Sequence, residues 1–215
     1  MPKFKLEAIY GQSRPDWSRQ LAFEASLDDL DPDAVTFACK KYVEKFEESQ
    51  SAVRDLDKVS ILSKMGLVIH GHVTNAALVL LGKSEASVFL GGIEPRITWT
   101  LYASDGSTIA YEHFEPPFIM QVDRVLGKIR NEKYRFFDRE DTLFPTEAYR
   151  YSPEVIRELL HNAIAHQDFR MSGKINVLEY EDRLVLKNEG TRPSRRRSRA
   201  DTSLPTTATP CFRAR

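Results

Sequence analysis

Residues 157–169 read RELLHNAIAHQDF, and this stretch decides the fold that we expect. Glu158, Asn162 and His166 are spaced four residues apart, so on a helix they lie on one side. The apolar positions between them can pack against a core, namely Leu159, Leu160, Ala163 and Ile164. An asparagine carbonyl suits Mg²⁺, and a glutamate can orient or deprotonate a water that attacks a phosphate. The pattern predicts a helix that carries phosphate chemistry; an ordinary amphipathic helix with a solvated polar side is the alternative.

The residues after this helix predict a β-hairpin. Residues 173–180 alternate apolar and polar side chains, Asp182-Arg183 forms a turn, and an apolar run follows at 184–186. The hairpin ends in Asn188-Glu189-Gly190, an Asn-x-Gly sequence. The chemistry-bearing helix is therefore followed directly by two strands and a glycine-containing loop.

This order of motifs resembles the GHKL ATP-binding fold of gyrase, MutL, heat-shock chaperones and histidine kinases. There the helix is the N-box, and the strand after it ends in Asp-x-Gly, whose Asp binds the adenine amino group. Asn188 stands at that position, a change that the RecG-related, Schlafen-type proteins tolerate. The resemblance implies that Glu158 is the catalytic base and that Asn162 is the Mg²⁺ ligand. It also places ATP contacts at Asn162, His166, Asn188 and Gly190, with Asp168 near the site.

Further blocks resemble the same RecG-related family in the same order, so that the resemblance covers residues 16–190. They are residues 16–18 with 27–32, 62–67 with 73–83 (LSKMGL and VTNAALVLLGK), 110–117 and 142–147. Members are described as helicase-like or as transcriptional regulators, which implies an ATP-binding, DNA-associated regulator with ATP and Mg²⁺ as cofactors and nucleic acid as partner. The sequence does not decide whether the protein forms homo-oligomers.

The expected fold class is α+β, in which a mixed module precedes an incomplete GHKL-like (Bergerat) helix and hairpin. We expect a linker and helix at 1–54, a mixed α/β module at 55–150, the partial ATP-binding segment at 151–190 and a disordered tail at 191–215. Residues 55–82 resemble a winged helix, which supports a second hypothesis: a non-enzymatic module that binds nucleic acid or protein.

Hydrophobic periodicity and cap residues predict the individual elements. We expect helices at 34–48 and 55–65, a hairpin at 67–73 turning at His70-Gly71, and a helix capped by Thr74 or Asn75 that runs to Leu81. Strands are expected at 97–102 and 109–114, a helix from Pro116-Pro117 to about Lys133, and a helix starting at Ser152-Pro153.

The tail at 191–215 has seven arginines, no lysine, one acidic residue and eight serines or threonines, a composition typical of disorder. We interpret it as a shifted reading frame. Compatible codons for residues 204–212, read one base earlier, spell PPYYRNPLL, which resembles the family at this point. We therefore expect a chain truncated at both ends, without the glycine-rich lid of a GHKL site, and an ATPase that is inactive in this form.

Charge and cysteine content limit the function further. Seven of the 31 basic and one of the 31 acidic residues lie in the tail, so residues 1–190 carry a net charge of −6. An acidic body argues against a broad nucleic-acid footprint. Two distant cysteines, Cys39 and Cys211, predict reduced thiols and a cytoplasmic protein. Gly82-Lys83-Ser84 is not a P-loop, because Ala77 stands where the first glycine is required.

Overall fold

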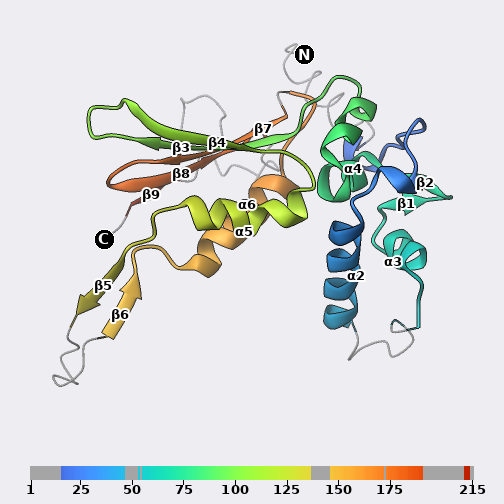
Figure 1. Ribbon diagram of the computed structural model, residues 1–215, viewed down its shortest axis with the longest axis horizontal. Coiled ribbons are helices and arrows are strands. Elements are labelled where there is room, and N and C mark those ends of the chain that lie inside the picture. Colours follow the sequence, from blue (N-terminus) through green and yellow to red (C-terminus); the bar gives the residue numbers. More distant parts are fainter. Residues whose placement is uncertain are drawn as a thin grey trace, which may run out of the picture. The chain divides into compact units, whose positions relative to one another are not determined.

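The structure, a computed structural model, describes residues 16–46, 53, 55–136, 146–171 and 173–190, and the backbone of 211–213. The chain divides into two compact units, Met1–Gly92 and Ile93–Arg215 (Figure 1). Each unit contains helices and a β-sheet, so the expected α+β class is confirmed. The division after Gly92 falls inside the mixed module that the motifs suggested for 55–150.

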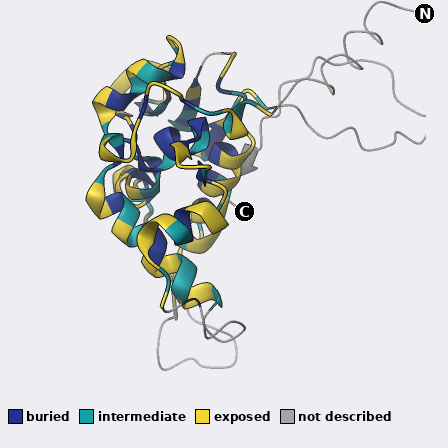
Figure 2. Cartoon of the chain, turned by 90° about the vertical axis from the view of Figure 1, so that its right-hand side faces the viewer, coloured by how far each residue is buried: buried dark blue, intermediate teal, exposed yellow. Residues whose placement is uncertain are grey.

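The first unit is mainly helical. Its elements are η1 (Trp17–Arg19), η2 (Leu27–Asp29), α2 (Pro32–Phe46), α3 (Lys58–Lys64), β1 (Val68–Ile69), β2 (His72–Val73), α4 (Asn75–Leu81) and η4 (Ser84–Leu90). Helix α2 begins before the expected Ala34, because the Asp31 carboxylate accepts hydrogen bonds from the backbone N–H groups of Asp33 and Ala34 and caps it. Figure 2 shows dark blue, buried positions on one side of the helices and yellow, exposed positions on the other.

The hairpin β1–β2 and the cap of α4 are confirmed as predicted. His70 (φ 50°) and Gly71 (φ 82°) form the two-residue turn, where both positions need a positive φ. Thr74 caps α4, since its hydroxyl oxygen accepts from Ala77 N–H at 3.3 Å and its hydroxyl donates to the Leu67 carbonyl at 3.1 Å. The order helix, hairpin, helix over 58–81 is thus the expected one.

The second unit is a mixed sheet with two helices on one face (Figure 1). Its elements are β3 (Arg96–Tyr102), β4 (Thr108–Phe114), α5 (Phe118–Lys128), β5 (Lys133–Phe136), β6 (Thr146–Tyr149), α6 (Pro153–Ala165), β7 (Lys174–Glu179), β8 (Arg183–Lys187) and β9 (Cys211–Arg213). The strand order is β4-β3-β7-β8-β9, in which β3 and β7 are parallel and the other pairs antiparallel.

Two neighbouring rows of side chains on this sheet are buried. In one row Trp99 pairs with Val177, and in the next Leu101 pairs with Glu179, which lies opposite Leu184 on the following strand. All five side chains are buried, and Glu179 is the charged one among them. The helices contribute their own apolar sides, with Phe118, Val122 and Val125 from α5 and Ile156, Leu160, Ala163 and Ile164 from α6.

One expectation for this unit was wrong, and one hairpin was not predicted. The helix after Pro117 ends at Lys128 rather than near Lys133, because Arg130 turns its backbone N–H and its guanidinium to the Glu179 carboxylate. Residues 133–136 then form β5, which pairs with β6 in an antiparallel hairpin that the sequence did not predict.

The tail was expected to be disordered throughout, and residues 211–213 differ from that expectation. Cys211–Arg213 forms β9 against β8, whose edge would otherwise present unpaired backbone N–H and C=O groups. The rest of the tail, on which the reading-frame interpretation depends, lies outside the described residues. Among the described helices, none is both long and apolar enough to cross a membrane.

Candidate functional site

Helix α6 forms as the sequence predicted. Ser152 is its N-cap and accepts from Val155 N–H at 3.4 Å, Pro153 occupies the first turn, and the helix ends at Ala165. Glu158, Asn162 and His166 are all exposed, whereas Ile156, Leu160, Ala163 and Ile164 are buried. Leu159 is half-buried. This polar side is available to a ligand, and the simpler interpretation as a solvated helix side predicts the same exposure.

The loop after α6 and the loop after β8 are in direct contact. The Asp168 backbone N–H donates to the Glu189 carbonyl at 2.7 Å. In return the Glu189 N–H donates to Oε1 of Gln167 at 2.8 Å, and Gln167 is buried. These reciprocal bonds hold the end of the candidate N-box helix against the Asn-x-Gly loop.

Gly190 makes the tightest approach in this contact. A Cβ atom added there would lie 2.1 Å from the His166 carbonyl oxygen and 2.9 Å from Nδ2 of Asn188. Only glycine therefore fits between the two loops without a shift of backbone. The structure thus brings His166, Asn188 and Gly190 together, although nothing in their spacing along the chain required it.

Glu158 and Asn162 are farther along the same helix side. With a rise of 1.5 Å per residue, Asn162 lies about 6 Å and Glu158 about 12 Å from His166 along the axis. The motif predicts that Asp168 lies near the site. Its carboxylate accepts two hydrogen bonds from Arg170, from Nε at 2.9 Å and from Nη2 at 2.8 Å. Within the described residues no group of three or more His, Cys, Asp or Glu side chains could hold a metal ion.

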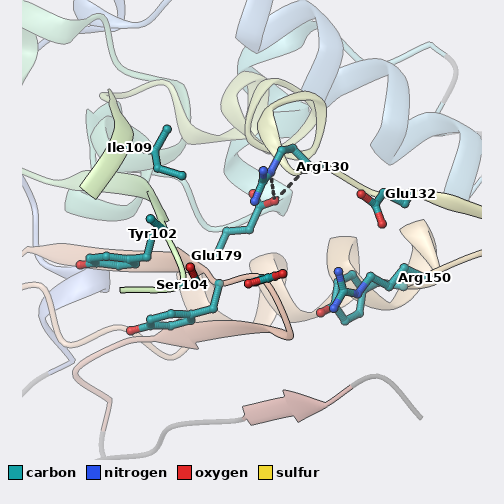
Figure 3. Close-up of a pocket in the computed structure, with 11 residues that line it drawn as sticks. Tyr102, Ser104, Ile109, Arg130, Glu132, Arg150 and Glu179 are labelled. Carbon is teal, nitrogen blue, oxygen red and sulfur yellow. Dashed lines mark hydrogen bonds and ion pairs between the residues drawn. The ribbon is translucent and has the colours of Figure 1, made fainter. Parts of the chain in front are cut away.

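A cleft of about 570 Å³ opens at the other end of the β7–β8 hairpin (Figure 3). Glu179 is at its floor, 4% exposed, and its carboxylate accepts from Trp99 Nε1 at 2.9 Å and from Arg130 N and Nε at 3.1 Å and 3.0 Å. Arg150 and Tyr151, which precede α6, form part of its wall.

The cleft was not predicted from the sequence, although the strand pattern of β7 contains one signal of it. Every second side chain of a strand points to the same side of the sheet, which here groups Glu179 with Ile175 and Val177. A carboxylate therefore occupies a position where the alternation predicts a core residue. A buried carboxylate requires partners. The identity of those partners, Trp99 and Arg130, depends on tertiary contacts that no local pattern contains.

Comparisons with known proteins give a fold but no activity. Residues 7–90 match a family described as a domain of unknown function, DUF8451. The chain is similar in structure to the DIP2311 protein from Corynebacterium diphtheriae, with 21% sequence identity and a TM-score of 0.61. The similarity covers 87% of this chain and 36% of that protein, so this chain spans about a third of its length. No curated protein matches the chain.

Proposed function

We propose that residues 151–190 belong to a GHKL-type ATP-binding site of a RecG-related, DNA-associated transcriptional regulator. The observation that carries this proposal is the contact of the His166 carbonyl with Gly190, because it joins the helix and the Asn-x-Gly loop that the resemblance assigns to one nucleotide site. The 12 Å or so between His166 and Glu158 along the helix leaves room for adenine at one end and phosphates at the other.

Each residue has a distinct role in this proposal. The Asn188 side-chain oxygen accepts from the adenine amino group, and Gly190 permits the close approach of the loop. Asn162 offers a hard oxygen ligand to Mg²⁺, which takes its other ligands from phosphate and water. Bound Mg²⁺ would neutralise phosphate charge. The exposed Glu158 carboxylate would orient a water or accept its proton.

We expect the 215-residue chain to bind Mg-ATP weakly, with a Kd of about 1 mM or higher, which corresponds to roughly −4 kcal/mol. In this proposal Asn188 is the adenine contact and Asn162 the one metal ligand, and the described residues include no glycine-rich lid that would enclose the phosphates. Calorimetry with Mg-ATP measures the affinity, and a frame-restored chain should bind measurably more tightly. Micromolar binding by the 215-residue chain would show that the lid is unnecessary.

Substitution at Asn188 distinguishes a specific site from non-specific binding. Asn188→Asp should strengthen ATP binding, because a charged acceptor forms a stronger hydrogen bond with the amino group, and Asn188→Ala should abolish it. Asn176→Asp is a matched control, since Asn176 lies on the same hairpin at a half-buried position of β7. Equal affinities across these variants would rule out Asn188 as the adenine contact.

Glu158→Ala should leave the stability nearly unchanged. Glu158 is exposed, and alanine is the better helix former, so the polar side loses no packing. Leu160→Ala, on the same helix but fully buried, should cost about 2–5 kcal/mol. Urea denaturation of both variants gives the comparison. A large loss in Glu158→Ala would make this glutamate structural and remove the main support for the N-box assignment.

A second candidate function uses the segment 55–82 of the first unit as a winged-helix-like module that binds nucleic acid or protein. It is favoured by an exposed aromatic ring at the hairpin: Phe23 is 72% exposed, and its ring meets the His72 ring edge-on at 5.5 Å between centroids. Gel-shift titrations of the full chain and of a chain ending at Gly190, at two salt concentrations, test this candidate. Salt-resistant, sequence-specific binding by the shorter chain would favour it over the ATP-binding site.

A further inference from the structure

Two consecutive peptide groups in the loop after β8 are held by residues at the end of helix α6. The N–H of the peptide group between Asn188 and Glu189 donates to Oε1 of Gln167 at 2.8 Å. The carbonyl of the next peptide group, between Glu189 and Gly190, accepts from the Asp168 N–H at 2.7 Å. Because each peptide group is planar and rigid, these two bonds fix the path of the chain from Asn188 to Gly190.

A side chain forms the first of these bonds because the nearby backbone carbonyls of α6 are already in use. Helix α6 ends at Ala165, and two carbonyls of its last turn accept from the two N–H groups that follow, at 3.0 Å and 3.4 Å. The His166 carbonyl lies against Gly190. The acceptor for the Glu189 N–H is therefore the carboxamide of Gln167, the first residue after the helix cap.

Gln167 is buried, and both ends of its carboxamide are bonded. The Glu189 N–H requires the carboxamide oxygen, which turns Nε2 to the Asp168 carbonyl at 3.1 Å. Glutamine supplies an acceptor and a donor on one side chain, and buried polar groups are stable only where such partners are present. The orientation of this side chain between the two loops is therefore fixed.

The loop that carries Gln167 is itself anchored. Phe169 is buried, and its ring lies 6.2 Å, between centroids, from the ring of Phe118, a fully buried residue of α5. The Asp168 carboxylate accepts from the backbone N–H of Arg170 at 3.1 Å and from its guanidinium. A side chain that extends from such a fixed backbone can hold a second loop in place.

Asn188 stands at the start of the segment that is held. Its Nδ2 lies 2.9 Å from the position that a Cβ atom on Gly190 would take, so its carboxamide packs beside the glycine. A rotation of the peptide group that Gln167 holds would carry the Asn188 side chain with it. Hydrogen bonds weaken steeply as their distances and angles depart from the preferred values, so a contact made by Asn188 depends on this alignment.

We infer that Gln167 is a positioning residue: through the Glu189 N–H it aligns the Asn188 side chain for its contact with adenine, without touching the nucleotide itself. The effect on nucleotide binding rests on the proposed ATP site. The alignment of the loop, by contrast, exists in the protein without any ligand. The two can therefore be measured separately, by amide exchange and by nucleotide titration.

Two buried glutamines give a matched pair of variants for NMR of the ¹⁵N-labelled full chain. Gln121 is as buried as Gln167, but its Oε1 accepts from Arg124 Nη1 within α5, at 3.0 Å. Gln167→Leu should speed exchange of the Glu189 amide about tenfold, the equivalent of one lost hydrogen bond. It should also lower the slope of the Gly190 amide shift against Mg-ATP concentration about tenfold. Gln121→Leu should change neither, and Gln167→Glu, which keeps an oxygen for the Glu189 N–H, should retain the slow exchange.

Three outcomes count against this inference or against the site on which it rests. Equal exchange of the Glu189 amide in Gln167→Leu and Gln121→Leu would overturn the inference, because Gln167 would then not hold the loop. Faster exchange with an unchanged response to Mg-ATP would also overturn it and would leave the ATP site intact. No response to Mg-ATP in the unaltered chain would refute the ATP site, and the role of Gln167 in binding with it, while the exchange of the Glu189 amide would still decide whether Gln167 holds the loop.

Discussion

Glu179→Ala is expected to lower the free energy of unfolding by about 2–4 kcal/mol. The substitution leaves the buried Trp99 indole N–H without its acceptor and releases Arg130 from the turn that ends α5. It also leaves a gap in the buried row beside Leu101 and Leu184. Urea denaturation followed by tryptophan fluorescence measures the loss.

Glu147→Ala is the matched control for this prediction. Glu147 also pairs with an arginine, Arg135, but both side chains are exposed on the β5–β6 hairpin. Solvent screens such a pair, so its removal should change the stability little. Glu179→Gln separates charge from hydrogen bonding, because it keeps an acceptor for Trp99. If Glu179→Ala and Glu147→Ala had equal effects, the buried hydrogen bonds of Glu179 would not stabilise the fold.

The elements predicted from sequence are those whose causes are local. The turn at His70-Gly71, the Thr74 cap and the start of α6 at Ser152 follow from residues a few positions apart, and each is present. The hairpin β7–β8 also forms where its alternation predicted it. The helix after Pro117 was predicted to run too far, because the hydrogen bond that ends it joins the Arg130 N–H to Glu179, 49 residues away.

The arrangement of the site depended more on non-local contacts. The parallel pairing of β3 with β7 places Trp99 beside the hairpin, 80 residues away from Glu179 in sequence, and no periodicity indicates that pairing. The hairpin β5–β6 was missed for the same reason, since its strands lie on either side of residues 137–145. The close approach of Gly190 to the His166 carbonyl was implied by the family resemblance and not by the spacing of these residues along the chain.

Gly190→Ala is expected to lower the free energy of unfolding by about 1–3 kcal/mol and to abolish any binding of Mg-ATP. The added Cβ would overlap the His166 carbonyl oxygen, a backbone atom that cannot rotate away. The loops must therefore separate, which stretches the bonds from Asp168 to Glu189 and from Glu189 to Gln167. Hydrogen exchange at the Asp168 amide reports this separation independently of global stability.

Gly127→Ala is the control that isolates the effect of this contact. Gly127 lies inside α5, and a Cβ there would meet no heavy atom within 4 Å. Alanine at such a helix position should therefore stabilise the protein by about 0.5–1 kcal/mol. Opposite signs for the two glycine substitutions would show that Gly190 is required by the close approach of the loops. If Gly190→Ala were as harmless as Gly127→Ala and left the Asp168 amide protected, the loops would not be held together, and the ATP-site proposal would lose the contact on which it depends.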